Sequence, residues 1–174
     1  MMKNTLLILG SLFLCLQLSF AQESCSDLMN KGYEQAAKEN KNVFVIFHAS
    51  WCGWCKKMEK NINDEKCKDF FNSNYIFVYL TVKETDVNKH LENPGALKLL
   101  KKYKGENEGI PFWLIFDKEG SLIGDSFNKE GKNMGCPAST EEVEQFAEIL
   151  EKTSELTEDE LEIVKGVFLI KAGN

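Results

Sequence analysis

The sequence predicts an α/β fold in which a mixed β-sheet is flanked by helices and followed by a C-terminal helical extension. Three runs of β-branched and aromatic residues, at 43–47, 75–82 and 109–116, are typical of buried strands. Helical patterns separate the first two runs, and a strand, a crossover helix and a second strand imply a parallel pair. The turn at 117–120 joins the third run to 121–123. This turn predicts an antiparallel hairpin beside the parallel pair.

The first 21 residues have the layout of a secretory signal peptide. Lys3 provides a basic start, residues 6–18 are mostly apolar, and Ser19-Phe20-Ala21 has the small-x-small form of a cleavage site. A retained membrane anchor is the rival interpretation, but the apolar stretch is shorter than the ~20 residues that cross a bilayer. We expect cleavage after Ala21 and export, to a periplasm or as a secreted protein, with no stable membrane anchor afterwards.

Residues 22–174 are expected to form a single domain, because they can bury a core and contain no Pro- or Gly-rich linker. The chain has a formal net charge of −6 at pH 7, and its basic residues form no isolated block. These features argue against nucleic acid as a partner.

The elements before the second strand follow from local patterns. Ser26 or Asp27 is a plausible N-cap for a helix that ends near Asn40. The uninterrupted apolar run at 43–47 predicts a strand covered on both faces. Helices are expected from 52 to 61 and from 64 to 71.

The later elements carry clearer boundary signals. Pro94 is expected in the first turn of a helix that continues to Tyr103, and 126–138 is expected to be a loop. Ser139 and Glu142 form a capping box before a helix. A second capping box, Thr157 with Glu160, favours a terminal helix, although residues 167–170 are also compatible with a strand.

The segment Trp51-Cys52-Gly53-Trp54-Cys55-Lys56 follows the first strand and begins the next helix. The unpaired N–H groups and the dipole at a helix N-terminus favour a thiolate at Cys52. Three residues on, Cys55 lies on the same helical face, within reach for a disulfide that forms and opens. We therefore expect an accessible redox pair in which Cys52 is the attacking sulfur.

The pair has three other interpretations. A zinc site needs two further ligands at recognisable spacing, whereas the chain has no second Cys pair and two histidines, His48 and His90. A c-type haem attachment normally has His directly after the second Cys, where this chain has Lys56. A static structural disulfide is compatible with export, but so short a loop constrains the unfolded chain little. No metal or other cofactor is expected.

Removal of the signal peptide would take Cys15 and leave five cysteines, so at least one thiol lacks an intramolecular partner. Cys67 lies at helical spacing from Phe70 and Phe71 and is expected to fill the core. Cys25 and Cys136 are candidates for a long-range disulfide.

Residues 49–56, together with Gly109-Ile110-Pro111, make the chain resemble the thioredoxin family over about 42–150. The resemblance implies a thioredoxin-like fold in which Pro111 follows a cis peptide bond and faces the Cys pair. Ile110 would then offer its N–H and C=O to an extended substrate. Trp51, Gly53 and Trp54 complete the expected groove, although Trp51 has packing as its alternative role.

The resemblance also implies thiol–disulfide exchange with client proteins that contain disulfides or thiols, and with a redox partner that the sequence does not identify. Cys52 would form the mixed disulfide and Cys55 would resolve it. A peptide-binding module in which the Cys pair is secondary or regulatory is the alternative function.

Two departures from the thioredoxin pattern limit which properties of that family can be expected of this chain. Ile46 stands where thioredoxins have a buried acid linked to proton transfer, and Gly-Trp replaces their Gly-Pro between the cysteines. Water, or a carboxylate brought close by folding, would have to accept the proton of Cys55. His48 is interpreted as a strand-end residue, and Lys56 and Lys57 either add positive charge near the thiolate or are solvated.

Overall fold

The computed structural model describes residues 22–170, so the predicted signal peptide at 1–21 lies outside the described residues. Four strands form one sheet in the order β2-β1-β3-β4. They are β1 (Asn42–His48), β2 (Tyr75–Thr81), β3 (Phe112–Phe116) and β4 (Leu122–Asp125). β1 is parallel to β2 and antiparallel to β3, and β3 and β4 form the hairpin. The predicted mixed sheet is confirmed.

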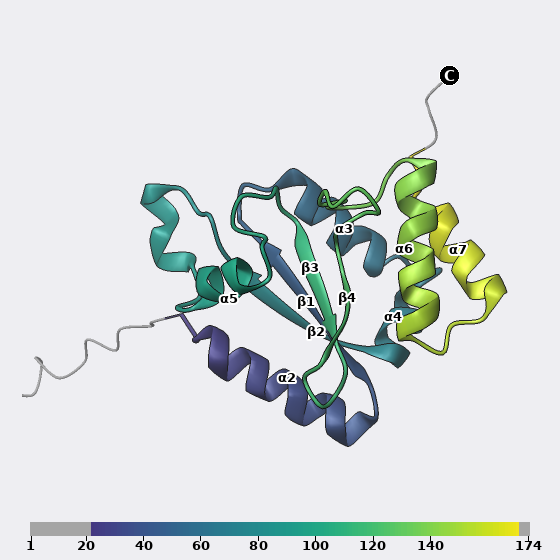
Figure 1. Cartoon of the computed structure of the whole chain (residues 1–174), viewed down its shortest axis with the longest axis horizontal. Coiled ribbons are helices and arrows are strands. Elements are labelled where there is room, and N and C mark those ends of the chain that lie inside the picture. The colour runs from purple at the N-terminus through teal and green to yellow at the C-terminus, as the bar shows by residue number, and fades with distance from the viewer. Residues whose placement is uncertain (1–21, 171–174) are drawn as a thin grey trace, which may run out of the picture.

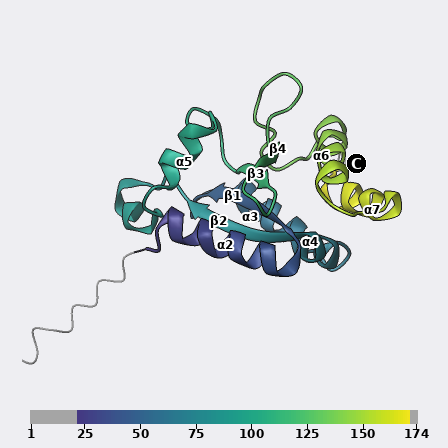
Figure 2. The same cartoon turned by 60° about the horizontal axis from the view of Figure 1, so that its bottom comes forward.

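Helices flank this sheet (Figures 1 and 2). Their bounds are α2 (Cys25–Glu39), α3 (Gly53–Ile62), α4 (Lys68–Asn74), the 3₁₀ segment η2 (Asp86–Leu91), α5 (Ala96–Lys102), α6 (Thr140–Thr153) and α7 (Glu158–Phe168). Among the described residues, no helix is both long enough and apolar enough to cross a membrane.

β1 divides the core into two layers because successive side chains of a strand point to opposite faces. Val43, Val45 and Phe47 pack with residues of α2 and α5. Phe44 and Ile46 pack with residues of α3, α4, α6 and α7. All five side chains are almost fully buried, so the strand is covered on both faces, as its uninterrupted apolar sequence predicts.

The start of α2 differs from the prediction. Ser24, and neither Ser26 nor Asp27, is the N-cap, because the Ser24 hydroxyl accepts a hydrogen bond from the backbone N–H of Asp27. The helix ends as expected at Asn40, which adopts a left-handed conformation with φ of 54°.

The starts of α4 and α5 also differ from the prediction. Residues 64–67 form turns. The Asp64 carboxylate accepts a hydrogen bond from the backbone N–H of Lys66, which competes with the hydrogen bonds of a helix. The helix α4 therefore begins at Lys68. Pro94 lies before α5, whose N-cap is Gly95 at φ 89°. The Pro94 carbonyl instead accepts from the N–H of Cys25, an N-terminal contact that the local sequence does not encode.

Both predicted capping boxes are present, at the starts of α6 and α7. Residues 167–168 complete α7, so the strand alternative was wrong for them. Phe168 is fully buried, and its ring centroid lies 5.0 Å from that of Phe146. This packing makes α7 part of the core on the α6 side of the sheet.

Within residues 22–170, the cysteines outside the Cys52–Cys55 pair are Cys25, Cys67 and Cys136, and all three are free and buried. Cys67 is fully buried in the core, as expected. The hypothesis of a Cys25–Cys136 disulfide was wrong, because Cys25 packs in the layer with α2 and Cys136 packs in the layer on the other face.

Candidate active site

The Cys pair lies where the chain leaves β1 and enters α3. Cys52 is the N-cap of α3, and its Sγ accepts a hydrogen bond from the backbone N–H of Cys55 at 3.1 Å. The two cysteines are joined by a disulfide, with Cα atoms 5.3 Å apart. A helix N-terminus is therefore directed at Cys52, as the sequence predicts, and would stabilise negative charge on that sulfur.

The pair is less accessible than expected. Cys52 is 2% exposed and Cys55 is 6% exposed. Ala49 and Ile110 form one apolar cluster with the two cysteines and cover much of their surface. Both cysteines are therefore largely shielded from solvent in the oxidised protein.

Two residues that follow β2 hold the segment before the pair in place. Glu84 is 6% exposed, and its carboxylate accepts hydrogen bonds from the backbone N–H of Ser50 at 2.5 Å and from the Ser50 hydroxyl at 2.8 Å. The indole N–H of Trp51 donates to the Lys83 carbonyl at 2.9 Å. Charge-assisted bonds of this kind are stronger than neutral ones, so the approach to Cys52 is anchored to the end of β2.

The segment before β3 lies beside the same cysteine. The Ile110–Pro111 peptide bond is cis, and the Ile110 carbonyl oxygen lies 3.5 Å from Cys52 Sγ. The Asn133 amide donates to the carbonyls of Gly109 at 2.8 Å and Pro111 at 3.0 Å. Asn133 therefore fixes both sides of the turn that brings Ile110 to the Cys pair.

A cavity of about 290 Å³ continues from this turn along the loop before α6. Its lining residues are Trp54, Gly109, Ile110, Pro111, Asn133, Met134, Gly135, Cys136, Ala138 and Glu142. The loop is anchored to β3, because the indole N–H of Trp113 donates a hydrogen bond to the Gly135 carbonyl at 2.9 Å. Of the five residues that the sequence proposes for a groove, Trp54, Ile110 and Pro111 line this cavity, whereas Trp51 and Gly53 do not.

The two tryptophans near the pair are the most exposed large aromatic side chains of this region, at 55% for Trp51 and 52% for Trp54. Trp54 lines the cavity beside Pro111 and also a shallow apolar hollow with Gly53, Lys57 and Ile170. Trp54 therefore stands between two depressions, and an extended ligand in either of them would touch its ring.

A separate cavity of about 330 Å³ reaches Cys55. Ile46, His48, Ala49, Ser50, Cys55, Lys56, Glu59 and Tyr79 line it. Glu59, one helical turn after Cys55, is the carboxylate among these lining residues. Burial lowers the pKa of His48, and the negative charges of Glu59 and Glu84 oppose this shift.

The sequence analysis did not identify Glu84 or Asn133. Glu84 could have been found, because parallel strands end at the same sheet edge and a polar residue just after the second strand faces the residues just after the first. No local pattern marks Asn133, since its role depends on how the loop before α6 folds back.

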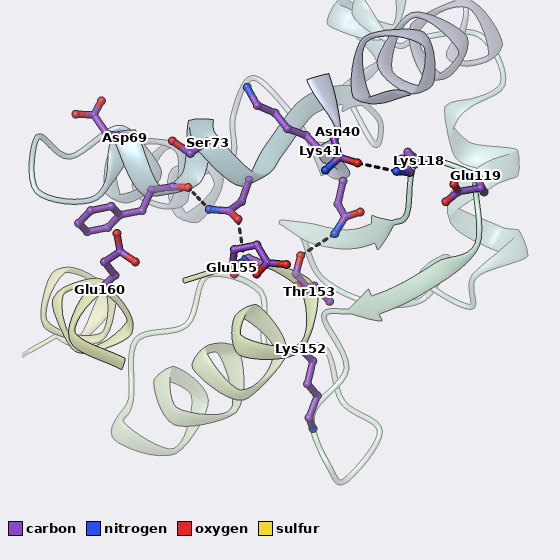
Figure 3. Close-up of a pocket in the computed structure, with 14 residues that line it drawn as sticks. Asn40, Lys41, Asp69, Ser73, Lys118, Glu119, Lys152, Thr153, Glu155 and Glu160 are labelled. Carbon is purple, nitrogen blue, oxygen red and sulfur yellow. Dashed lines mark hydrogen bonds between the residues drawn. The ribbon is translucent and has the colours of Figure 1, made fainter. Parts of the chain in front are cut away.

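A further pocket, of about 570 Å³, is at the opposite end of β1, where Asn42 begins the strand. Figure 3 shows that some of its polar side chains bond to other groups of the same pocket. The Asn42 amide donates to the Thr153 carbonyl at 2.7 Å, and the Lys118 ammonium donates to the Asn40 side chain at 2.6 Å. These bonds join β1 and the hairpin turn to the end of α6, which is a structural role. Within residues 22–170, no cluster of His, Cys, Asp or Glu is suited to a metal ion.

A family model described as thioredoxin-like matches residues 26–118, more than half of the chain. The chain belongs to the thioredoxin-like family. The matched segment contains both the Cys52–Cys55 pair and Pro111, so the two motifs that carried the resemblance fall inside one family domain.

Local sequence similarity extends to protein disulfide isomerases. A 32-residue stretch is 50% identical to protein disulfide-isomerase A5 of Mus musculus, and a stretch of the same length is 56% identical to protein disulfide-isomerase of Gallus gallus. Each match covers 18% of this thioredoxin-like chain and 6% of the relative. The chain therefore aligns with only a small part of these curated relatives.

Solved structures resemble this chain at low sequence identity and with modest TM-scores. A disulphide isomerase from Xylella fastidiosa Temecula1 is 18% identical with a TM-score of 0.49, covering 63% of this chain and 79% of that one. A thioredoxin from Thermus thermophilus is 17% identical with a TM-score of 0.47, covering 70% and 81%. All these scores are below 0.5, so no role in the present site is taken from them.

Proposed function

We propose that this chain is an exported thiol–disulfide oxidoreductase that uses Cys52 and Cys55 to reduce or isomerise protein disulfides. Membership of the thioredoxin-like family and the cysteine spacing support oxidoreductase chemistry. The observation that carries the proposal is the Cys52–Cys55 disulfide at the N-terminus of α3, beside the groove at Ile110 and Pro111. The N-terminal sequence of the first 21 residues supports export.

In the reduced enzyme, the N-terminus of α3 stabilises the Cys52 thiolate. This thiolate attacks one sulfur of a client disulfide, a Cys52–client bond forms, and the client's second sulfur leaves as a thiolate. Cys55 then attacks Cys52 Sγ and releases the first client sulfur. The client gains two electrons, and the Cys pair loses them by forming its disulfide.

Substrate positioning is assigned to the groove. An extended client segment would lie along the turn at Ile110 and Pro111, with Trp51 and Trp54 as exposed aromatic contacts. Because Ile110 O is 3.5 Å from Cys52 Sγ, backbone bonds to Ile110 would place a client cysteine next to the attacking sulfur. Cys52 is nearly buried, so this positioning also favours clients with flexible, exposed disulfides.

The test is insulin reduction with dithiothreitol as the electron source. Cys52→Ser is expected to abolish turnover, and Cys55→Ser is expected to accumulate mixed disulfides with the substrate. Cys25→Ala, which changes a buried thiol in the other core layer, is the matched control and should keep full activity. Substantial turnover by Cys52→Ser would overturn the proposal.

The alternative, a peptide-binding module in which the pair is secondary, is favoured by the low exposure of Cys52 beside an open groove. Under this alternative, peptides would bind equally well to the wild type and to Cys52→Ser, and neither would turn over insulin. Titration of the Cys pair against glutathione then gives the direction of electron flow, with about −270 mV expected for a reductant and about −120 mV for an oxidant. The mass of the exported protein tests cleavage after Ala21.

A further inference from the structure

Cys55 must lose a proton before it can attack Cys52 in the resolving step, because the thiolate is the nucleophile. The residue at position 46 is no acceptor, since Ile46 is apolar and 2% exposed. The groove on the Ile110 side is also unsuited, because the client would occupy it during this step. The remaining route from Cys55 is the separate cavity of about 330 Å³.

Side chains from three elements face this cavity. β1 contributes Ile46 and His48, α3 contributes Cys55, Lys56 and Glu59, and β2 contributes Tyr79. The His48 ring is held in place on two sides. Its Nε2 lies 3.3 Å from the Thr81 hydroxyl, and it packs edge-on against Tyr79 with ring centroids 5.8 Å apart.

We propose that His48 is the proton acceptor for Cys55 in the resolving step, and that Glu59 stabilises the imidazolium that forms. This inference depends on the proposed oxidoreductase function. The Cys55 proton crosses the cavity to the imidazole, and the volume is large enough for water to carry it. The Cys55 sulfur then bonds to Cys52, the Cys52–client bond breaks, and the client sulfur leaves with the electron pair.

The other ionisable groups that face the cavity are poorer acceptors. A lysine ammonium group has three hydrogen-bond donors and no acceptor, which excludes Lys56. Burial, with a smaller contribution from Glu59, raises the pKa of Tyr79 to about 12, so its phenol stays protonated. Glu59 is exposed, and carboxylates as a class are weaker bases toward thiols than imidazoles are.

His48 meets the requirements of a base. Burial lowers its pKa below the ordinary value, so the imidazole is neutral and able to accept a proton at pH 7. Glu59 on α3 and Glu84 after β2 supply the negative charge that favours the protonated form. Lys56 and Glu59 are both exposed, so solvent screens both charges, whereas Glu84 is buried at 6% exposure.

The experiment separates the two chemical steps by stopped flow. Reduced full-length protein is mixed with excess 5,5′-dithiobis(2-nitrobenzoate), which releases one equivalent of coloured thiolate when Cys52 attacks and a second when Cys55 resolves the mixed disulfide. His48→Gln is expected to keep the first, bimolecular phase and to slow the second, unimolecular phase by about a hundredfold. His90→Gln changes the chain's other histidine, which is exposed in η2, and should leave both phases unchanged.

The pH profile supplies a readout that a merely structural effect would not move. The wild-type second phase should slow with an inflection below pH 6.5, and His48→Gln should lack this inflection. Glu59→Gln removes a charge that raises the pKa of His48, so it should move the inflection to lower pH even if His48→Gln folds poorly. Unchanged second-phase rates and profiles in these variants would overturn the inference, whereas loss of the Cys52 phase in the wild type would overturn the proposed function itself.

Discussion

Replacing Glu84 with alanine should destabilise the folded chain and impair the Cys pair. The Glu84 carboxylate is buried at 6% exposure and accepts two hydrogen bonds from Ser50, at 2.5 and 2.8 Å. Ser50 lies two residues before Cys52, so these bonds position the segment that delivers the attacking sulfur. The substitution removes both acceptors and leaves a space beside that segment.

The magnitude follows from the number of bonds and the exposure of the donors. Hydrogen bonds to a charged group contribute roughly 1.5–3 kcal/mol each. Ser50 is exposed, so water can replace the carboxylate at its donors and recover part of that energy. We therefore expect Glu84→Ala to lower the free energy of unfolding by about 2 kcal/mol in total, which corresponds to a fall in Tm of roughly 4–8 °C.

Urea unfolding of the oxidised protein measures this change. Glu84→Gln keeps one acceptor oxygen and should lose about 1 kcal/mol. Asp86→Asn alters an exposed carboxylate two residues further on and should change stability by less than about 0.5 kcal/mol. The rate of Cys52 attack should fall about tenfold in Glu84→Ala, because the sulfur is no longer held in its attacking position.

If Glu84→Ala matched Asp86→Asn in both stability and rate, Glu84 would neither stabilise the fold nor position Cys52. A loss of stability with an unchanged rate would refute the positioning role alone, since the segment would then hold Cys52 without Glu84.

Three further predictions concern the core and its thiols. The Asn61 side-chain nitrogen is buried with no hydrogen-bond partner among the described residues, so Asn61→Leu should stabilise the fold by about 1 kcal/mol in urea unfolding, and a loss of that size would contradict this account. Phe168→Ala should lower the free energy of unfolding by about 3–5 kcal/mol, because it opens a cavity between α6 and α7. Ile163→Ala, at a 40% exposed position of α7, should change it by less than about 1 kcal/mol. Equal effects of the two substitutions would show that α7 is not packed as described. Burial raises the pKa of Cys67 to about 11 and that of Cys136 to about 12, so these thiols remain protonated in the folded chain where they ionise in the unfolded chain. Their contribution to stability is present below about pH 9 and is lost as pH rises toward 12. Replacing both cysteines with alanine should therefore flatten the decline of the unfolding free energy over this pH range. An unchanged slope of that free energy against pH would contradict the prediction.

Much of the fold is encoded in local patterns. The uninterrupted apolar run at 43–47 predicts a doubly covered strand because neither face has a polar residue to present to water. The two capping boxes before α6 and α7 are defined by residues three apart, so their hydrogen bonds need no tertiary contact. The Cys52–Cys55 pair is likewise local, because a spacing of three within one helical turn brings the sulfurs together.

The helix starts that differ from the prediction depend on distant partners or on competing local hydrogen bonds. Ser24 caps α2 while the next residue, Cys25, bonds to the carbonyl of Pro94, some seventy positions away. The turn at Asp64 delays α4, because a side-chain acceptor satisfies the backbone N–H of Lys66. Short-range patterns cannot rank such alternatives, since the energies involved are about 1 kcal/mol each.

The sequence by itself therefore determined the mixed sheet with its helices, the Cys pair at a helix N-terminus and the family resemblance, because each follows from side chains a few residues apart. The tertiary structure decided how far the pair is buried, which residues anchor it and what surrounds Cys55. Glu84 and Asn133 reach the site from other elements, and His48 meets Glu59 only when β1 packs against α3. Long-range packing sets these contacts, and it depends on the chain as a whole.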